Sequence, residues 1–293
     1  MLPAVLKGCL NLLPRTEALI DLALEEDAAN GDVTSQSIFS QDHFSQAQIL
    51  ARQDMVVCGL EIAERVFCRI DPSIRVEFVA HDGDQVKNGS TVLKIEGPTI
   101  SLLIAERTAL NFLQRLSGIA TLSRRFADAA SSAGTGVRIV DTRKTTPGWR
   151  ALEKYAVRCG GCFNHRSSLG EHVLIKENHI TAAGSLENAV KLARDSVPHC
   201  AKIEVETESS GDVREALKAG AEVIMLDNMS PSQIEQAVAL IDGAAIVEIS
   251  GGIGLDTVAD YALPGVDVIS IGALTHSAPA ADFSMIIPPG HSE

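Results

Sequence analysis

The chain has 293 residues, 45% of them hydrophobic and 22% charged, with a formal net charge of −13, so its length accommodates two domains or one large barrel with an appendage. The acidic balance and an aromatic content of only 4% disfavour a nucleic-acid binder. We also expect a cytoplasmic protein without a transmembrane helix, because no long uncharged apolar run, no basic n-region of a signal peptide and no clustering of the six cysteines is found.

The first 117 residues predict a domain that mixes helices and strands. Its expected elements are, in chain order, a helix over 13–29 that ends at Asn30-Gly31, a strand over 45–57, a helix over 61–70, a strand over 75–80, a hairpin over 81–97 and a helix over 99–118. The hairpin is predicted from the turn signals Asp82-Gly83 and Asn88-Gly89, which interrupt an alternating pattern.

From residue 137 on, strands rich in β-branched residues alternate with helices. The expected strands cover 137–141, 172–176, 201–206, 222–227, 244–250 and 266–272. Spacings of roughly 20 to 35 residues between strands indicate right-handed βαβ units and a parallel sheet. Because about eight strands would make a complete barrel, we expect an incomplete α/β barrel over 118–276, with the tail 277–293 packing back on the first domain.

Functional side chains or glycines follow every one of these predicted strands. They are Arg143 and Lys144, Lys176, Glu206, Asp227, Ser250-Gly251-Gly252, and Gly272. Active sites of α/β barrels lie at the carboxyl ends of the strands. Residues 138–176 hold eight of the chain's 25 Lys and Arg, and cations anchored at strand ends bind anions well. The pattern therefore predicts an anion site in preference to a solvated basic face.

The glycine turns predict a phosphate site. Ser250-Gly251-Gly252 follows an apolar strand and leaves backbone N–H groups free, and a helix expected over 255–263 would direct its N-terminus at them. Loops after the last two barrel strands usually bind phosphate, and His276 could add a donor. We therefore expect a sugar phosphate or pyrophosphate here, with two tight structural turns as the alternative.

Two acids at neighbouring strand ends allow more than one interpretation. Glu206 and Asp227 fit a Mg²⁺ ion held largely through water, or they stabilise a developing positive charge on a sugar. They could also be ion-pair partners of Arg143 and Lys176, which is compatible with either role. Lys176 itself could form a Schiff base, although carboxylate binding requires fewer assumptions.

The spacing Cys159-x₂-Cys162 near His165 raises the question of zinc. A structural zinc site normally needs a second ligand pair. His199-Cys200 is the other candidate, and its spacing does not match a zinc knuckle. We therefore disfavour zinc here.

Eight segments resemble quinolinate phosphoribosyltransferases, the decarboxylating enzymes of NAD synthesis. They are AERTALNFLQRLSGIAT (105–121), DTRKTTPG (141–148), LEKYAVRCGG (152–161), NHR (164–166), LIKENHI (174–180), IMLDNMS (224–230), EISGGI (248–253) and ISIGALTHSAP (269–279). The resemblance implies an N-terminal sandwich, an incomplete barrel, and a homodimer or larger assembly with shared sites. It also implies that quinolinate and phosphoribosyl pyrophosphate react with Mg²⁺ to give nicotinate mononucleotide, pyrophosphate and CO₂.

The resemblance also implies roles for individual residues. The residues implied to bind substrate are Arg107 of a partner subunit and Thr142, Arg143, Lys144, His165, Arg166 and Lys176. Lys144, Glu206 and Asp227 are implied to be catalytic, and the two acids to face the metal. Phosphate binding falls to Ser250, Gly251, Gly252, Ile271, Gly272, Ala273 and His276.

The chain departs from the family pattern beside His165-Arg166. It has Cys162 where the family usually has glycine, and Ser167-Ser168-Leu169 where a Leu-Gly-Leu-like run is usual. The alternatives to this enzyme are a molybdenum-transport-associated homologue of the same fold, a Schiff-base lyase that uses Lys176, and a non-catalytic binder of phosphorylated sugars.

Overall fold

The computed structural model describes residues 14–289, and the chain divides into two compact units. Unit 1 comprises residues up to 124, 146–161 and 277 onward, and unit 2 comprises 125–145 and 162–276. This division departs from the expected boundary after residue 117, chiefly because residues 146–161 group with unit 1. The expectation of no signal peptide concerns the amino terminus, which lies outside the described residues, as does Leu13 at the start of the first expected helix.

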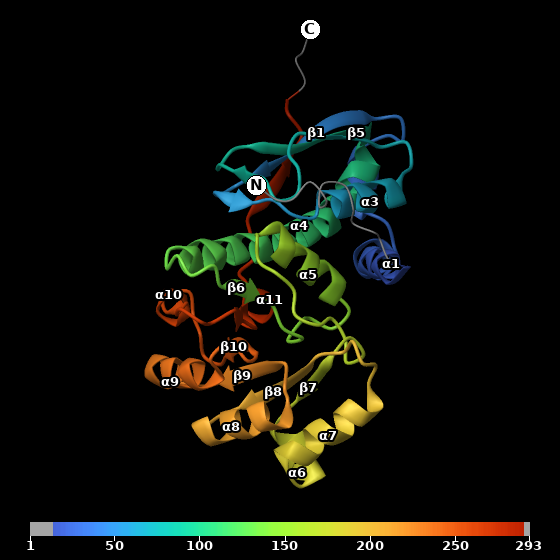
Figure 1. The fold of residues 1–293 in the computed structure, drawn as a ribbon. Helices are drawn as coiled ribbons and strands as arrows, with labels where there is room; N and C mark the ends of the chain where they lie inside the picture. The colour runs from blue at the N-terminus through green and yellow to red at the C-terminus, as the bar shows by residue number, and fades with distance from the viewer. Residues whose placement is uncertain (1–13, 290–293) are drawn as a thin grey trace. The chain divides into compact units, whose positions relative to one another are not determined.

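Unit 1 is built around a four-stranded antiparallel sheet. The strand order is β12 (Phe283–Ile286), β1 (Phe44–Ala51), β5 (Thr91–Pro98) and β3 (Arg75–Phe78). Buried residues alternate along β1 at Ala47, Ile49 and Ala51, so one face of the sheet packs on a core. Helices α3 (Leu60–Ile70) and α4 (Thr99–Ser131) lie on that side (Figure 1).

The hairpin expected over residues 81–97 is wrong. Strand β4 (Gln85–Val86) pairs with β2 (Met55–Val56), whereas β5 pairs with β1 and β3. The turn at Asn88-Gly89 therefore passes the chain from one sheet to another. Residues of an earlier segment hold this turn: Asn88 N–H donates to Asp54 Oδ1 at 3.0 Å, and Gly89 N–H donates to the Ala51 carbonyl at 2.8 Å.

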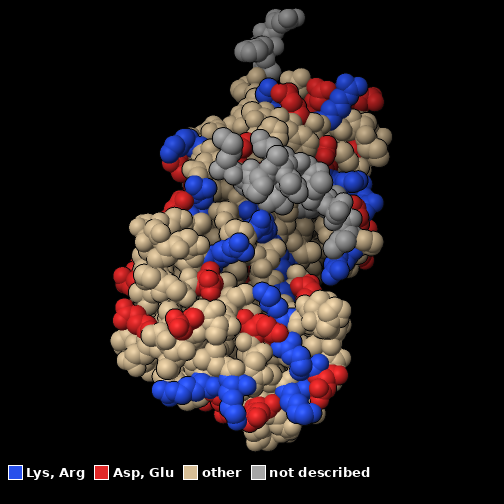
Figure 2. Space-filling model, viewed as in Figure 1, with Lys and Arg blue, Asp and Glu red and all other residues tan. Residues whose placement is uncertain are grey.

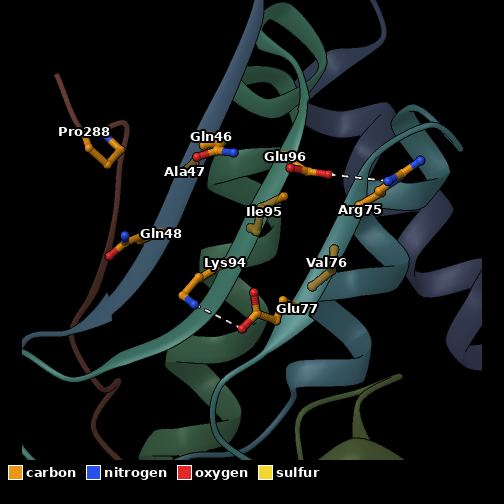
Figure 3. Close-up of a pocket in the computed structure, with 10 residues that line it drawn as sticks. All are labelled: Gln46, Ala47, Gln48, Arg75, Val76, Glu77, Lys94, Ile95, Glu96 and Pro288. Atoms are coloured by element: carbon orange, nitrogen blue, oxygen red, sulfur yellow. Dashed lines mark hydrogen bonds and ion pairs between the residues drawn. The ribbon is translucent and has the colours of Figure 1, made fainter. Parts of the chain in front are cut away.

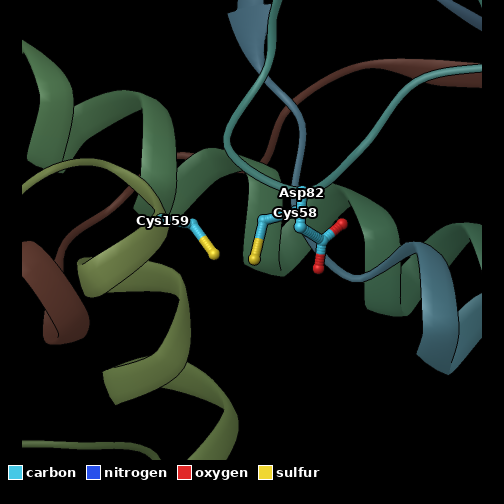
Figure 4. A group of neighbouring side chains, drawn as sticks. All are labelled: Cys58, Asp82 and Cys159. Carbon is cyan, nitrogen blue, oxygen red and sulfur yellow. The ribbon is translucent and has the colours of Figure 1, made fainter. Parts of the chain in front are cut away.

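Asp82, expected in a hairpin turn, caps helix α3 instead. Its carboxylate accepts the Gly59 and Leu60 N–H groups at 2.9–3.1 Å and the Tyr155 hydroxyl at 2.9 Å. Burial raises the pKa of Asp82. The sulfur atoms of Cys58 and Cys159 point toward one another beside it (Figure 4), and the possible ligand atoms of these three residues lie within 4.8 Å of one another. The hydrogen bonds account for the buried carboxylate without an ion.

Helix α4 continues 13 residues beyond the expected end at 118, since it spans Thr99–Ser131. Gly118, the last residue of the expected helix, lies inside α4. A Cβ atom there would lie 2.0 Å from the Pro279 carbonyl oxygen, so this glycine allows close backbone packing. The other helices of unit 1 are α1 (Pro14–Ala28), α2 (Val33–Ile38) and α5 (Arg150–Cys159).

Unit 2 contains the expected incomplete α/β barrel. Its six strands are all parallel, in the order β6 (Arg138–Val140), β11 (Val268–Ser270), β10 (Ile246–Ser250), β9 (Val223–Asp227), β8 (Ile203–Thr207) and β7 (Val173–Ile175). The helices are α6 (Glu177–Ala183), α7 (Leu186–Ser196), α8 (Ser210–Ala219), α9 (Pro231–Ile241), α10 (Val258–Tyr261) and α11 (Ala273–His276). Helices α7, α8 and α9 lie along one side of the sheet in Figure 1. The expected fold class is confirmed.

The helix expected over 255–263 is only four residues long, from Val258 to Tyr261. It starts six residues after Gly252, so it does not place its N-terminus on the glycine turn as expected. A helix this short also has little dipole to offer an anion. If this turn binds phosphate, its own backbone must supply the donors.

None of the helices in residues 14–289 has the length and apolar composition needed to cross a membrane. On the face drawn in Figure 2, Lys and Arg side chains are interspersed with Asp and Glu side chains.

Candidate active site

A pocket of about 460 Å³ opens at the carboxyl ends of the strands of unit 2. Its lining residues are Thr142, Arg143, Lys144, His165, Arg166, Leu174, Lys176, Glu206, Met225, Asp227, Ser250 and Ser270. Nine of these were singled out from the sequence, whereas Leu174, Met225 and Ser270 were not. The pocket thus brings together nine of the residues singled out from the sequence, six of which were assigned to predicted strand ends.

Strand register places the acids of this pocket. Glu206 of β8 is the register partner of Met225 on β9, and Asp227 of β9 is the partner of Ser250 on β10. Because side chains two residues apart on a strand share a face, Met225 and Asp227 face the same side. The two carboxylates therefore occupy successive levels of the pocket wall, with Asp227 beside the glycine turn.

The cation of β7 is paired with the acid of β8. Lys176 Nζ contacts Glu206 Oε2, and the Lys176 side chain is 45% exposed while that of Glu206 is 15% exposed. Lys176 also stands immediately before helix α6. The pair thus joins a cation expected to bind substrate to an acid expected to face the ribose.

The loop after β6 is held by two hydroxyl groups. Lys144 N–H donates to Thr142 Oγ1 at 3.0 Å, and Thr275 Oγ1 donates to the Lys144 carbonyl at 2.8 Å. Gly272 lies beside the same loop: a Cβ atom there would be 3.1 Å from the His276 ring and from Lys144 Cδ. The exposed side chains of Lys144 and His276 therefore meet at the turn after β11.

Arg166 is a buried cation of the pocket, with 8% of its surface exposed. Its Nη1 donates to the His172 carbonyl at 3.0 Å. Burial lowers the pKa of Arg166, and the nearby Arg143 lowers it further. Two guanidinium groups held close enough to repel each other form a site that attracts anions.

His165 is held at its backbone and at both ring nitrogens. Its N–H donates to Asp141 Oδ1 at 2.9 Å, and its Nδ1 accepts the Arg166 N–H at 2.8 Å. Its Nε2 lies 3.4 Å from Glu204 Oε2 and 3.4 Å from Glu248 Oε1. Since Nδ1 accepts a hydrogen bond, the ring proton in this arrangement is on Nε2, between the two carboxylates.

The nearby carboxylates favour a second proton on the His165 ring, whereas the hydrogen bond at Nδ1 disfavours it. Burial lowers the pKa of His165, but Glu204 and Glu248 outweigh burial and raise it to about 9. That proton would have to sit on Nδ1, where it would break the bond from Arg166. The hydrogen bond from the Arg166 N–H opposes this second protonation, and in the arrangement described the ring carries its proton on Nε2 alone.

Three residues of this cluster were missed from the sequence: His172, Glu204 and Glu248. Each acid stands two positions before a residue that was predicted, Glu206 or Ser250, within an otherwise apolar strand. A charged residue inside a buried strand is a usable signal, because burying a charge is costly unless it is paired. The site prediction rests on residues at strand ends, and charged residues inside the strands are not part of it.

The glycine turn after β10 has the backbone expected of an anion site. Gly251 and Gly252 have φ angles of +96° and +64°, and successive N–H groups in such conformations can form a concave donor surface. A Cβ atom on Gly251 would lie 2.2 Å from Asn228 Oδ1. Only glycine therefore fits at this position without displacing Asn228.

Within residues 14–289, the other site residues predicted from the sequence do not line this pocket. They are Gly251, Gly252, Ile271, Gly272, Ala273 and His276 of unit 2. Ile271 is buried, and its N–H donates to the Val140 carbonyl at 2.9 Å, so neither its side chain nor this N–H is directed to a ligand. Arg107 lies on α4 in unit 1, where it is exposed.

A second depression lies on the sheet of unit 1 (Figure 3), with a volume of about 410 Å³. Its charged side chains pair with one another: Lys94 Nζ lies 3.1 Å from Glu77 Oε1, and Arg75 Nη1 lies 3.8 Å from Glu96 Oε1. This paired, solvated surface lacks the excess of cations seen in the barrel. We therefore place the active site in the barrel pocket.

Two family models match the chain. The model described as the quinolinate phosphoribosyl transferase N-terminal domain matches residues 32–117, and that for the C-terminal domain matches residues 119–286.

Named relatives match over most of their length. A Bacillus subtilis protein named probable nicotinate-nucleotide pyrophosphorylase (carboxylating) is 42% identical over 260 residues, which cover 89% of each chain. A Nicotiana tabacum protein named quinolinate phosphoribosyltransferase (decarboxylating) 2a, mitochondrial, is 42% identical and covers 92% of this chain and 82% of its own. The crystal structure of NadC from Streptococcus pyogenes superposes with a TM-score of 0.90 at 40% identity, covering 95% of this chain and 98% of the other.

Proposed function

Because this chain belongs to the quinolinate phosphoribosyltransferase family, we propose that it transfers the phosphoribosyl group of phosphoribosyl pyrophosphate to quinolinate. The products are nicotinate mononucleotide, pyrophosphate and CO₂. The observation that supports this proposal most directly is that strand-end cations and two carboxylates line a single barrel pocket. That combination suits an anionic acceptor and a sugar that becomes positively charged during transfer.

Quinolinate carries two carboxylates, which Arg143, Arg166 and Lys176 bind. The planar guanidinium groups match a carboxylate with two parallel hydrogen bonds, whereas a lysine acts as a point charge. Each charge-assisted hydrogen bond contributes about 1.5–3 kcal/mol. Buried Arg166 is held in place by its contact with His172, so little side-chain entropy is lost when the substrate binds.

Phosphoribosyl pyrophosphate occupies the opposite side of the pocket. Its phosphates bind to the turn at Ser250-Gly251-Gly252, whose positive φ angles present N–H groups. They also bind near Gly272, where Lys144 and His276 meet. The ribose then lies between these turns and the quinolinate cations, opposite Glu206 and Asp227.

The reaction proceeds by transfer followed by decarboxylation. The pyridine nitrogen attacks the anomeric carbon as pyrophosphate leaves, through a state in which the ribose resembles an oxocarbenium ion. Glu206 and Asp227 stabilise that positive charge. The ring nitrogen of the adduct is then positive, so it accepts the electron pair left when the C2–carboxylate bond breaks, and a proton takes the place of CO₂.

A Mg²⁺ ion fits the donors beside the phosphate turn. Glu206 and Asp227 line the pocket and supply carboxylate oxygens, the ligand type that Mg²⁺ prefers. Glu206 is paired with Lys176, and Asp227 Oδ2 accepts the Asn228 Nδ2 donor at 2.6 Å, so both carboxylates are already oriented. Water and phosphate oxygens would complete the ligands of the ion, which would neutralise charge on the pyrophosphate.

The enzyme is proposed to act as a homodimer or larger assembly. In the family that the chain resembles, an arginine at the position of Arg107 enters the site of the neighbouring subunit. Here Arg107 is exposed on α4, which leaves its guanidinium accessible to a partner.

We place the enzyme in a reducing compartment, and specifically in the cytoplasm. The support is chemical: the cysteines at positions 58, 68, 159 and 200 are free thiols.

Substrate selectivity tests the proposed function. Quinolinate should be converted only with phosphoribosyl pyrophosphate present, and nicotinate, which lacks the 2-carboxylate, should not replace it. Equal turnover of nicotinate would contradict the proposal. A Schiff-base lyase would instead form a borohydride-stable adduct at Lys176 with a carbonyl substrate, and the pairing of Lys176 with Glu206 disfavours this because a paired ammonium is not a nucleophile.

A further inference from the structure

Two buried glutamates, Glu204 and Glu248, lie next to the pocket and have no part in the proposed chemistry. Glu204 is 2% exposed and Glu248 is 4% exposed. Within residues 14–289, Oε1 of each forms no hydrogen bond, although Glu248 Oε1 lies 3.4 Å from His165 Nε2. A buried carboxylate is costly unless cations and donors compensate it. The groups that these acids contact therefore indicate what the acids do.

Both acids converge on one imidazole ring from different strands. Glu204 comes from β8 and Glu248 from β10, and His165 Nε2 lies 3.4 Å from an oxygen of each. Glu204 also contacts a second ring, because its Oε2 lies 3.2 Å from His172 Nε2. The two histidine rings lie 5.0 Å apart, centroid to centroid. Glu204 thus joins both histidines, while Glu248 contacts His165.

The two histidines in turn hold Arg166 at both ends. The Arg166 N–H donates to His165 Nδ1 at 2.8 Å, and Arg166 Nη1 donates to the His172 carbonyl at 3.0 Å. Nδ1 can accept only while the ring proton is on Nε2. A carboxylate facing one ring nitrogen selects the role of the other, as it does for histidines that bind metals.

We propose that Glu204 and Glu248 are positioning residues for quinolinate, which hold the Nε2 proton of His165 and thereby fix Arg166 in the orientation that receives a substrate carboxylate. The inference rests on the proposed function, since it takes quinolinate as the ligand of Arg166. It goes beyond that function by assigning the binding geometry to acids that do not line the pocket. Glu204 has the larger effect because it contacts both histidines.

The charges around His165 give the proposal a second observable. The groups that face it are the carboxylates of Glu204 and Glu248, the His172 ring, Arg166, and Asp141, which accepts the His165 N–H. Removing either glutamate removes an anion that favours the protonated ring. The pKa of His165 therefore falls in each variant, by about one pH unit. Loss of the anion lowers the pKa whatever the glutamate does, so the readout specific to the proposal is the Nε2–H tautomer of the neutral ring, which should be less populated in each variant.

The test uses the isosteric variants Glu204→Gln and Glu248→Gln of the full chain, which keep one acceptor oxygen. Steady-state kinetics should show the KM for quinolinate raised about 10-fold in Glu204→Gln and less in Glu248→Gln. The KM for phosphoribosyl pyrophosphate should stay within about twofold, because its phosphates bind elsewhere. Glu222→Gln is the matched control: Glu222 also lies in unit 2 and pairs with Arg194 at 2.6 Å, and it does not line the pocket.

Nitrogen-15 NMR of the histidine rings supplies the second readout, with His165 assigned through its absence in His165→Gln. Folded glutamine variants with an unchanged quinolinate KM would overturn the proposal, provided that the parent enzyme converts quinolinate. Failure of the parent enzyme to turn over would instead contradict the proposed function. His165, His172 and Glu204 could also hold a metal ion, so stoichiometric zinc in the purified parent protein, lost in Glu204→Gln, would overturn the proposal in favour of a metal site.

Discussion

Lys176 Nζ contacts the Oε2 atom of Glu206 across the mouth of the pocket. The cation proposed to bind a quinolinate carboxylate is thus paired with the acid proposed to stabilise the ribose. A substrate carboxylate must share or replace that partner. Binding and catalysis therefore place opposite demands on Glu206, which predicts that the two can be separated by mutation.

Glu206→Gln should tighten quinolinate binding while it slows turnover. Without the carboxylate, Lys176 is available to the substrate, and a partly exposed pair of this kind is worth about 0.2–1 kcal/mol, or a Kd lower by a factor of roughly 1.4 to 5. The loss of charge stabilisation should lower kcat about 100-fold or more. Calorimetric titration with quinolinate and steady-state kinetics on the same sample measure both effects.

Asp227→Asn is the matched control for this separation. Asp227 also lines the pocket, but its carboxylate accepts a hydrogen bond from Asn228 and does not contact a substrate-binding cation. It should lose kcat without a gain in quinolinate affinity. Weaker quinolinate binding in Glu206→Gln would mean that Glu206 orients Lys176 for the substrate instead of competing for it.

Arg143→Lys should lose transition-state stabilisation although it conserves charge. Arg143 lines the pocket in the loop that starts after β6, three residues beyond Val140. The neighbouring Lys144 N–H is held by Thr142 Oγ1, so the guanidinium is carried on an ordered backbone, and a lysine cannot reproduce its paired hydrogen bonds to a carboxylate. We expect a loss of about 2–4 kcal/mol, or roughly 30- to 1000-fold in kcat/KM for quinolinate.

Binding titrations distinguish a local role of Arg143 from a general one. Affinity for phosphoribosyl pyrophosphate should change much less than affinity for quinolinate. Equal losses for both ligands would show that Arg143 shapes the whole site, and an unchanged kcat/KM would remove it from the site.

The barrel could be predicted from the sequence because each of its strands is a short apolar run followed by a polar residue or a glycine. A parallel strand that is buried on both faces is a nearly continuous apolar run. The carboxyl ends of parallel strands meet at one edge of the sheet. The predicted hairpin failed for a tertiary reason. Asn88-Gly89 is a good local turn, but Asp54 and Ala51 hold it from another part of the chain, and sequence-local signals do not report such partners.

The acids behind the site show a second limit of sequence reasoning. Glu206 was predicted because it ends a strand, whereas Glu204 was missed because it lies inside the same strand. Its role depends on His172 and His165, which are distant in sequence. Pairing of this kind becomes visible only when the strands are assembled.

Gly251→Ala should weaken binding of phosphoribosyl pyrophosphate and destabilise the protein. The φ angle of +96° strains any other residue, and the added Cβ would lie 2.2 Å from Asn228 Oδ1. We expect a loss of about 1–3 kcal/mol in the free energy of unfolding. Chemical denaturation and a titration with phosphoribosyl pyrophosphate measure the two effects.

Gly252→Ala is the control for the clash at Gly251. Its φ angle is +64°, and a Cβ atom there would meet nothing within 4 Å. It should therefore lose less stability and less affinity than Gly251→Ala. Similar losses in the two variants would show that backbone strain alone accounts for them, with no role for the contact with Asn228.

Arg107→Ala tests the proposed sharing of sites between subunits. The variant should be nearly inactive alone, as should Lys144→Ala. Hybrid dimers formed by mixing the two should regain activity, because one site then combines an intact barrel with an intact Arg107 from the partner. Failure to recover activity, with hybrid formation verified by differently tagged subunits, would contradict a shared site.

Release of CO₂ from quinolinate labelled in its 2-carboxylate measures the central claim most directly. The account predicts that the purified protein releases label only when phosphoribosyl pyrophosphate and Mg²⁺ are present, with one CO₂ formed per pyrophosphate. Quinolinate labelled in its 3-carboxylate should retain the label in nicotinate mononucleotide. Release without phosphoribosyl pyrophosphate, or no release by the folded protein with both substrates and Mg²⁺ present, would contradict the account.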